Sequence, residues 1–204
     1  MVLIACTTTQ CINQSLTVSR FPYLPQNKHT QILPLNHTDQ AVALRSYVTD
    51  LETLLASRNR TLELRPLHAA VALYGDAAAL AEEEAAFLHD QDAAAALGSP
   101  AHEVSERLAK LNDRLAFTER RFLSPAGLPG RPWFLHVGQA PGLHLGYGAE
   151  SLPGVTQAVN DGKMKLAEEQ VIVAAKRIHE AALYLAGRGE QQQEDAEGVA
   201  VRMD

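Results

Sequence analysis

The sequence predicts an all-α protein, a four-helix bundle with a long ordered loop between its last two main helices. Four segments repeat apolar residues at the three- and four-residue spacing of amphipathic helices. Hydrophobic residues make up 46% of the 204 residues and aromatic residues only 5%, so the expected core is built from Ala, Leu and Val. Such a core suits closely packed helices, and we expect no strand pairing.

The first helix is predicted over residues 36–57. Residues 1–34 are rich in Thr, Gln, Asn and Pro and show no sustained period, which is typical of an irregular N-terminal segment. The short polar side chains at 36–39 can accept hydrogen bonds from the first free N–H groups of a helix. Apolar residues then recur at helical spacing: Leu44, Tyr47, Val48, Leu51, Leu54 and Leu55.

The second helix is predicted over residues 64–96 and the third up to Phe122. The second has an apolar seam of Leu67, Val71, Tyr74, Ala78, Ala81, Ala85 and Leu88. Its acidic run at 82–84 is typical of a solvated helix face rather than of a metal or acidic-partner site. The Gly-Ser-Pro sequence at 98–100 ends this helix and begins the third. The buried stripe of the third is Val104, Leu108, Leu111, Leu115 and Phe122.

The last helices follow the long loop. A short helical piece is expected at about 155–159, with a break at the Asn-Asp-Gly sequence of 160–162. The final helix is predicted to end near Gly187, and its apolar face is Val171, Ala174, Ala175, Ile178, Ala182 and Leu185. Residues 188–204 are predicted to be a disordered polar tail. The helical domain is therefore expected to span residues 35–187.

The loop at residues 124–153 is the most informative part of the sequence. Its length of about 30 residues far exceeds the roughly two to eight residues that usually join helices. It contains the only Trp of the chain and half of its ten Pro residues. This composition indicates an ordered, packed loop, and such loops on helical scaffolds are usually functional.

Composition and charge exclude several classes of protein. The net charge of −6 gives no basic surface for nucleic acid. No apolar run is long enough for a membrane segment, and MVLIAC is too short and lacks the basic start of a signal peptide. Cys6 and Cys11 are interpreted as incidental thiols. Asn13, Asn36 and Asn59 begin N-x-S/T sequons, which accept glycans only in a secretory compartment.

No metal site or catalytic constellation is predicted. His136, His144 and Glu150 offer zinc-type donors, but their spacing matches no known ligand pattern, and loop histidines more often bind backbone carbonyls. Asp113 and Glu119 lie six residues apart on a predicted helix and so face different directions. The sequence also has no nucleotide-binding Gly motif and no HExxH motif.

The loop instead carries residues suited to binding. Trp133 and Phe134 are expected to anchor it to the bundle, and Arg131 offers a forked donor for a carboxylate. Tyr147 lies between glycines, where its hydroxyl is suited to contact a ligand or a neighbouring surface. A purely structural role for Tyr147 is an equally open alternative.

Several strings of the sequence resemble one known family. LNDRLAFTERRFLSPAGLPGRPWFLHVGQAP followed by HLGYGAESLPG closely resembles the C-terminal region of the glutamate carboxypeptidase II and transferrin receptor family. ILPLNHTDQAVALRSYV resembles the start of that family's transferrin-receptor-like dimerisation domain. The resemblance covers residues 31–187. It implies kinship with membrane-anchored, extracellular, N-glycosylated homodimers whose separate protease domain holds two zinc ions.

The resemblance also implies a function for this chain. It implies a non-catalytic dimerisation domain whose loop at 124–153 forms one wall of a substrate pocket. Tyr147 matches the family's tyrosine that contacts the C-terminal carboxylate of the substrate, and Gly146 replaces the lysine of the glutamate-binding members. Residues 1–30 do not resemble the protease domain, so no zinc or other cofactor is expected in this chain.

The expected partners are a second copy of the chain and a peptidase domain. One alternative is that the chain is the C-terminal part of an active zinc-dependent exopeptidase whose catalytic domain is missing from this sequence. Another is a generic helical adaptor that shares only the family's architecture.

Overall fold

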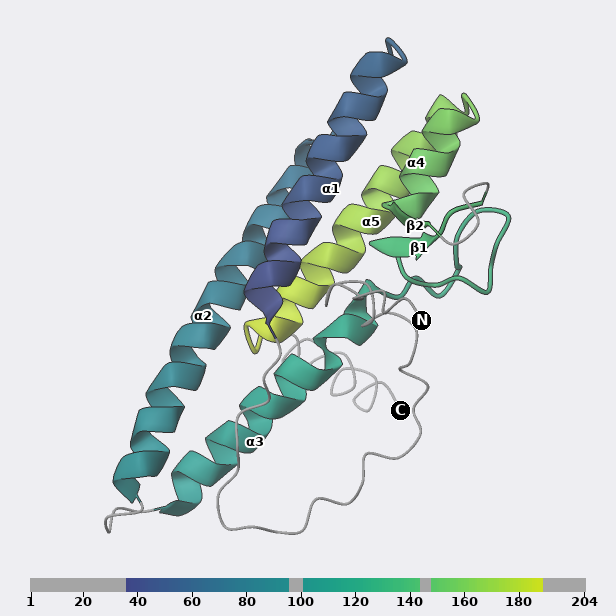
Figure 1. Ribbon diagram of the computed structural model, residues 1–204. Coiled ribbons are helices and arrows are strands. Elements are labelled where there is room, and N and C mark those ends of the chain that lie inside the picture. Colours follow the sequence, from purple (N-terminus) through teal and green to yellow (C-terminus); the bar gives the residue numbers. More distant parts are fainter. Residues whose placement is uncertain (1–35, 96–100, 144–147, 189–204) are drawn as a thin grey trace, which may run out of the picture. The chain divides into compact units, whose positions relative to one another are not determined.

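The computed structural model of the chain describes residues 36–95, 101–143 and 148–188. They form α1 (His37–Ser57), α2 (Arg65–Ala95), α3 (Ala101–Phe117), the 3-10 helix η1 (Thr118–Phe122), β1 (Gln139–Pro141), β2 (Ala149–Ser151), α4 (Pro153–Asn160) and α5 (Met164–Leu185). The all-α class is confirmed (Figure 1). The predictions for residues 1–34, the 98–100 break and the tail from 189 lie outside the described residues, and the domain limits at 35 and 187 stay predictions.

The first helix begins and ends where the sequence predicts. The backbone N–H of Asp39 donates to Oδ1 of Asn36 at 2.9 Å, which is the expected N-cap bond. After Ser57, Asn59 takes a left-handed backbone conformation with φ of +50°. Asn tolerates this conformation better than most residues, so it allows the tight turn into α2.

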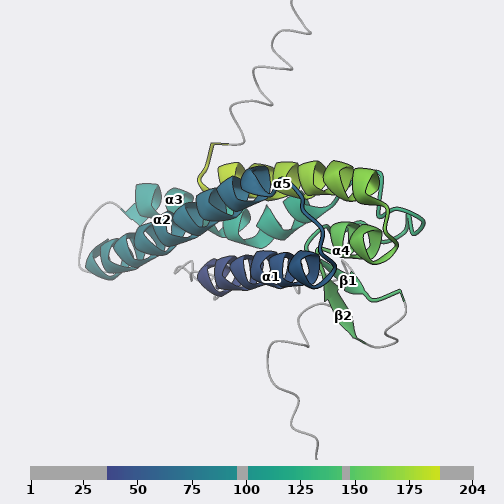
Figure 2. The ribbon, with the colours of Figure 1, turned by 90° about the horizontal axis from the view of Figure 1, so that it is seen from above.

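Helices α2 and α5 pack along each other at the centre of the helical unit. Helix α1 packs on α2, α4 packs on α5, and α3 and η1 complete the core (Figures 1 and 2). The predicted seam of α2 is buried in this core, including Leu67, Tyr74, Ala78 and Leu88. The many small alanines permit the close approach of α2 and α5. No helix among the described residues is long and apolar enough to cross a membrane.

Two local features differ from the prediction. The third helix ends at Phe117, and η1 carries the chain to Phe122, whose side chain is fully buried. A 3-10 turn is a common way to tighten the C-terminal end of a helix. The expectation of no strand pairing is wrong, because β1 and β2 pair antiparallel. Each strand has only three residues, which is too short for an alternating pattern to show in the sequence.

Candidate functional site

We call residues 123–152, between η1 and α4, the connecting loop. Its first half closes on itself against η1. Leu123 and His136 form an antiparallel bridge, and the N–H of Ser124 donates to the carbonyl of Leu135 at 2.8 Å. The N–H of Val137 donates to the carbonyl of Phe122 at 3.0 Å. The prediction of an ordered loop is therefore confirmed for this half.

Gly127 makes a tight turn in this half of the loop possible. Its φ is +68°, a backbone conformation that side chains disfavour. A Cβ atom at this position would lie 2.3 Å from the carbonyl oxygen of Pro132. The chain therefore requires glycine here for both its conformation and the available space.

The second half of the loop is the β1–β2 hairpin. Ala140 pairs with Glu150, and hydrogen bonds extend the pairing at both ends, from the N–H of Gly142 to Gly148 at 2.9 Å and from the N–H of Leu152 to Gly138 at 2.8 Å. The predicted contact residues Gly146 and Tyr147 fall within 144–147, outside the described residues. The roles of Gly146 and Tyr147 stay predictions. The structure describes the paired residues that precede and follow this segment.

A buried ion pair lies beneath the hairpin. Nη2 of Arg131 lies 4.0 Å from Oε2 of Glu150, and the two side chains are only 8% and 9% exposed. Nη1 of Arg131 donates to the carbonyl of Pro141 at 2.5 Å. The guanidinium thus contacts both strands of the hairpin. The guanidinium predicted as a forked donor lies at ion-pair distance from a carboxylate of the chain itself, and its hydrogen bond goes to the carbonyl of Pro141.

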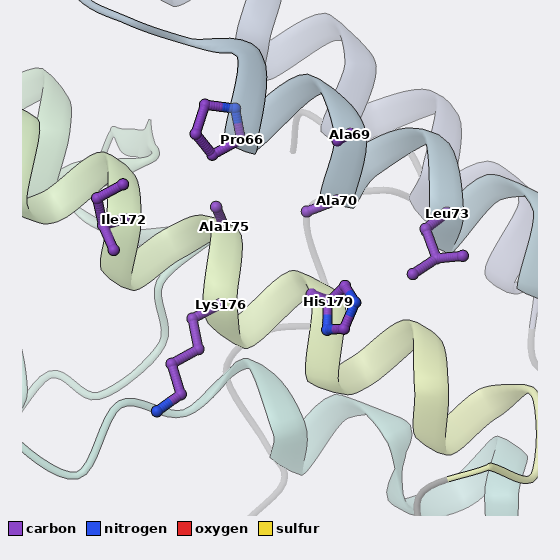
Figure 3. A pocket seen from close by; sticks show the side chains of 8 residues that line it. All are labelled: Pro66, Ala69, Ala70, Leu73, Ile172, Ala175, Lys176 and His179. Atoms are coloured by element: carbon purple, nitrogen blue, oxygen red, sulfur yellow. The ribbon is translucent and has the colours of Figure 1, made fainter.

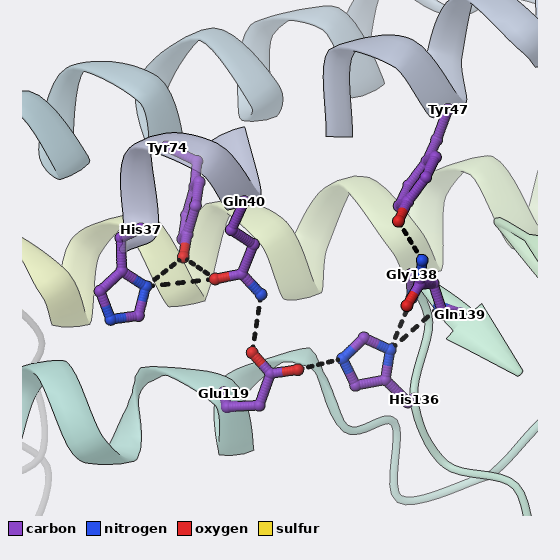
Figure 4. A network of polar contacts seen from close by, with 8 residues as sticks. All are labelled: His37, Gln40, Tyr47, Tyr74, Glu119, His136, Gly138 and Gln139. Carbon is purple, nitrogen blue, oxygen red and sulfur yellow. Dashed lines mark hydrogen bonds and ion pairs between the residues drawn. The ribbon is translucent and has the colours of Figure 1, made fainter. Parts of the chain in front are cut away.

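His136 links η1 to the base of the hairpin (Figure 4). Its Nδ1 accepts hydrogen bonds from the N–H groups of Gly138 at 3.1 Å and Gln139 at 3.0 Å. Because a backbone N–H can only donate, Nδ1 must be unprotonated. The ring proton therefore sits on Nε2, which donates to Oε1 of Glu119 at 2.9 Å.

Glu119 continues this network into the helices. Its Oε2 accepts from Nε2 of Gln40 in α1 at 2.7 Å. The hydroxyl of Tyr74 in α2 donates to Oε1 of the same Gln40 and also lies 2.8 Å from Nδ1 of His37. Nε2 of His37 donates to the carbonyl of Leu115 at 3.0 Å. One polar network therefore joins α1, α2, the end of α3, η1 and the connecting loop.

The network also includes Tyr47 of α1, whose hydroxyl accepts a hydrogen bond from Nε2 of Gln139 (Figure 4). The pKa values of Glu119, Tyr74 and Tyr47 are shifted. Burial acts to raise the pKa of Glu119, but the hydrogen bonds that its carboxylate accepts from His136 and Gln40 outweigh burial and bring the pKa below its ordinary value. Burial, helped by the charge of Glu119, raises the pKa of Tyr74 and of Tyr47. At neutral pH, Glu119 is thus the acceptor and both tyrosines keep their protons.

Trp133 does not anchor the loop to the bundle, which corrects the sequence prediction. Its side chain is 70% exposed and contacts Phe134, with 6.1 Å between ring centroids. Phe134 is partly buried and lies against the guanidinium of Arg131, which is 5.4 Å from its ring centroid. Backbone bonds and the buried Arg131 hold this part of the loop, so the indole is not needed for it.

The polar side chains of the site contact other parts of the chain itself. Among residues 36–95, 101–143 and 148–188, no three His, Cys, Asp or Glu side chains are grouped to hold a metal ion. The lone pair of Nδ1 of His136 is occupied by backbone N–H groups, and Glu150 faces Arg131. His144, the other predicted donor, lies outside the described residues.

The hydrogen bonds of Glu119, Gln40 and Tyr74 are not predicted from the sequence. Glu119 enters the sequence prediction only as a carboxylate six residues from Asp113, whereas its hydrogen-bond partners are 17 and 79 residues away. The structure shows that residues remote in sequence share one network, and no local pattern signals this.

Comparisons with known proteins agree on one family. The model of the transferrin receptor-like dimerisation domain matches residues 62–186. The chain is 27% identical over 167 residues to the probable glutamate carboxypeptidase LAMP1 of Arabidopsis thaliana, covering 77% of this chain and 22% of that protein. It is 27% identical over 155 residues to a probable glutamate carboxypeptidase of Arthroderma benhamiae, covering 74% and 20%.

A third relative matches a shorter stretch. The probable glutamate carboxypeptidase VP8 of Zea mays is 34% identical over 89 residues, which is 40% of this chain and 12% of that protein. The chain therefore spans about a fifth or less of the length of these relatives. Because the family model covers more than half of the sequence and the helical fold agrees with it, the chain belongs to the transferrin receptor-like dimerisation domain family.

Proposed function

We propose that this chain is a non-catalytic dimerisation domain that forms a homodimer through its helices. The observation that carries this proposal is the exposure of large apolar side chains on those helices. Leu80, Phe87 and Ile172 are each more than half exposed. A monomer leaves these side chains in water, whereas a second copy can cover them. The family match at residues 62–186 supports the same role.

Native mass spectrometry of the full chain tests the proposal. We expect a species of twice the 22.1 kDa mass of one chain that dissociates on dilution. A single-chain mass at every concentration would contradict it.

We further propose that the connecting loop forms one wall of a substrate pocket in a glutamate carboxypeptidase-like peptidase. The β1–β2 hairpin supports this. Arg131 and His136 hold the hairpin at its base, and backbone hydrogen bonds pair the residues before 144–147 with the residues after them. In this proposal Tyr147 contacts the C-terminal carboxylate of a peptide. Gly146 supplies no cation, so the pocket favours a less acidic terminal residue than glutamate.

A loop exchange tests the pocket. The corresponding loop of the Arabidopsis relative is replaced by residues 123–152, and kcat/KM is measured for peptides ending in Glu and in a neutral residue. We expect Gly146→Lys in this chimera to raise the preference for Glu, and Tyr147→Phe to lower kcat/KM for both peptides. Unchanged values in both variants would contradict the role of the loop.

A second candidate is the C-terminal part of an active zinc-dependent exopeptidase. The small share of the relatives that this chain covers favours it. Immunoblotting of the natural product for its mass, with a chelator-sensitive peptidase assay, separates the two candidates. A longer, chelator-sensitive product supports the exopeptidase, and an inactive product of this chain's mass supports the isolated domain.

A further inference from the structure

We propose that two copies of this chain pair antiparallel along α2, about a two-fold axis at Leu80, so that Phe87 of each copy enters the groove between α2 and α5 of the other. This inference rests on the proposed dimerisation and adds to it the surface and the register. It is carried by the placement of apolar residues on α2, the shape of the groove and the charges around both.

A stripe of apolar residues runs along α2, partly buried at its N-terminal end and exposed at Leu80 and Phe87. Pro66, Leu73, Leu80 and Phe87 follow one another at intervals of seven residues. Seven residues are nearly two helical turns, so these side chains share one face of a helix about 46 Å long. Leu80 is 54% and Phe87 is 51% exposed, whereas the opposite face of α2 is buried in the core. We call these four residues the α2 stripe.

One end of the α2 stripe lies in a groove (Figure 3). The groove has a volume of about 510 Å³ and is lined by Pro66, Ala69, Ala70, Leu73, Ile172, Ala175, Lys176 and His179. The alanines leave its floor shallow and apolar, and Ile172 on its α5 wall is 57% exposed. The groove therefore offers an apolar bed of a size that suits an aromatic side chain.

The other end of the α2 stripe carries the matching group. Phe87 stands on the C-terminal half of α2, and the guanidinium of Arg107 lies over its ring, 5.7 Å from the ring centroid. Leu73 and Phe87 are each seven residues from Leu80, on opposite sides of it. When Leu80 meets Leu80 in an antiparallel pair, Phe87 of one copy faces Leu73 of the other. The two-fold symmetry makes the same contact twice.

The charges favour the same register. Glu83 and Asp90 are exposed and lie about one turn to either side of Phe87. Lys176 and His179 line the groove, and Lys176 is 67% exposed, with Glu180 4.0 Å away on its own helix. The antiparallel pair brings these acidic residues to Lys176 and His179 of the second copy. A parallel pair would instead place acidic residues against acidic residues.

Matched surface variants test the surface. Leu80→Asp is expected to weaken the dimer by about tenfold or more, because it buries a carboxylate at the two-fold axis. Val42→Asp is the control, since Val42 on α1 has a similar exposure of 57% and lies outside the α2 stripe. The dissociation constant is measured by sedimentation, and circular dichroism checks that both variants keep their helices.

A charge exchange tests the register. Lys176→Glu and Asp90→Lys alone are each expected to weaken the dimer severalfold, and the double variant to restore most of the affinity. A wild-type dimer that Leu80→Asp does not weaken, or a double variant no tighter than the single ones, would overturn the α2 pairing and leave dimerisation standing. A wild-type chain that stays monomeric would overturn both.

Discussion

Nε2 of His136 lies 2.9 Å from Oε1 of Glu119 while Nδ1 of the same ring accepts two backbone N–H groups of the hairpin. The ring thereby connects the end of η1 to the base of β1. Gly138 permits this close approach, because a Cβ atom there would lie 3.0 Å from Cε1 of His136. These hydrogen bonds attach the base of the hairpin to the helical core.

His136→Ala is expected to destabilise the protein by about 2 kcal/mol, because it removes the acceptor of two N–H groups and the donor to Glu119. Urea unfolding at a fixed protein concentration measures the change. His68→Ala is the control. His68 also lies 2.9 Å from a carboxylate, that of Glu52, but its side chain is 53% exposed, so a change within about 0.5 kcal/mol is expected. Equal effects of the two variants would contradict the structural role of His136.

The lowered pKa of Glu119 predicts a loss of stability in acid. The folded carboxyl binds its proton at a lower pH than the unfolded one, whose pKa is about 4.3. Its contribution is therefore fully present above that pH and is lost as the pH falls through the folded pKa. Urea unfolding from about pH 6 to about pH 3 should show a smaller acid-dependent loss in Glu119→Gln than in the wild type. Parallel pH profiles would contradict this.

Arg131→Ala is expected to destabilise the protein on the order of 3 kcal/mol, because it removes a buried cation that faces Glu150 and the donor to Pro141. Hydrogen exchange of the amides of Gly142 and Leu152 should also accelerate, since these amides close the hairpin.

Arg65→Ala is the control for Arg131. Arg65 pairs with Glu63 at 2.9 Å, but the side chains are 89% and 58% exposed, so almost no change is expected. Unchanged hairpin exchange in Arg131→Ala would show that the guanidinium does not hold the strands.

Gly127→Ala should be clearly more destabilising than Gly130→Ala. Both glycines have a positive φ, of +68° and +72°, so both substitutions carry the cost of about 1 kcal/mol for a left-handed residue. Only at Gly127 would the new Cβ atom also meet the backbone, at 2.3 Å from Pro132, whereas no atom lies within 4 Å at Gly130. Thermal unfolding of the two variants checks this, and equal melting temperatures would contradict it.

The sequence predicts the helices well because their signals are local. The N-cap at Asn36 and the spacing of Leu44, Val48, Leu51 and Leu55 define α1 to its last residue. The strings of the loop that resemble the family likewise predict the family that the comparisons show. These features depend on residues that are close in sequence.

The rest depends on contacts between distant residues. Tyr74 is predicted as an apolar seam residue and is indeed buried, but nothing in the sequence shows that its hydroxyl meets Gln40 of α1. Trp133 is predicted to anchor the loop to the bundle, yet its side chain is 70% exposed. Its loop is held by backbone hydrogen bonds and Arg131, whose partners cannot be chosen from residue type alone.

Sedimentation equilibrium of the full chain over a wide concentration range tests the central claim most directly. If the helical unit is a dimerisation domain, the fitted mass should rise with concentration to twice the 22.1 kDa of one chain. A mass that stays at 22.1 kDa across the range would contradict the claim.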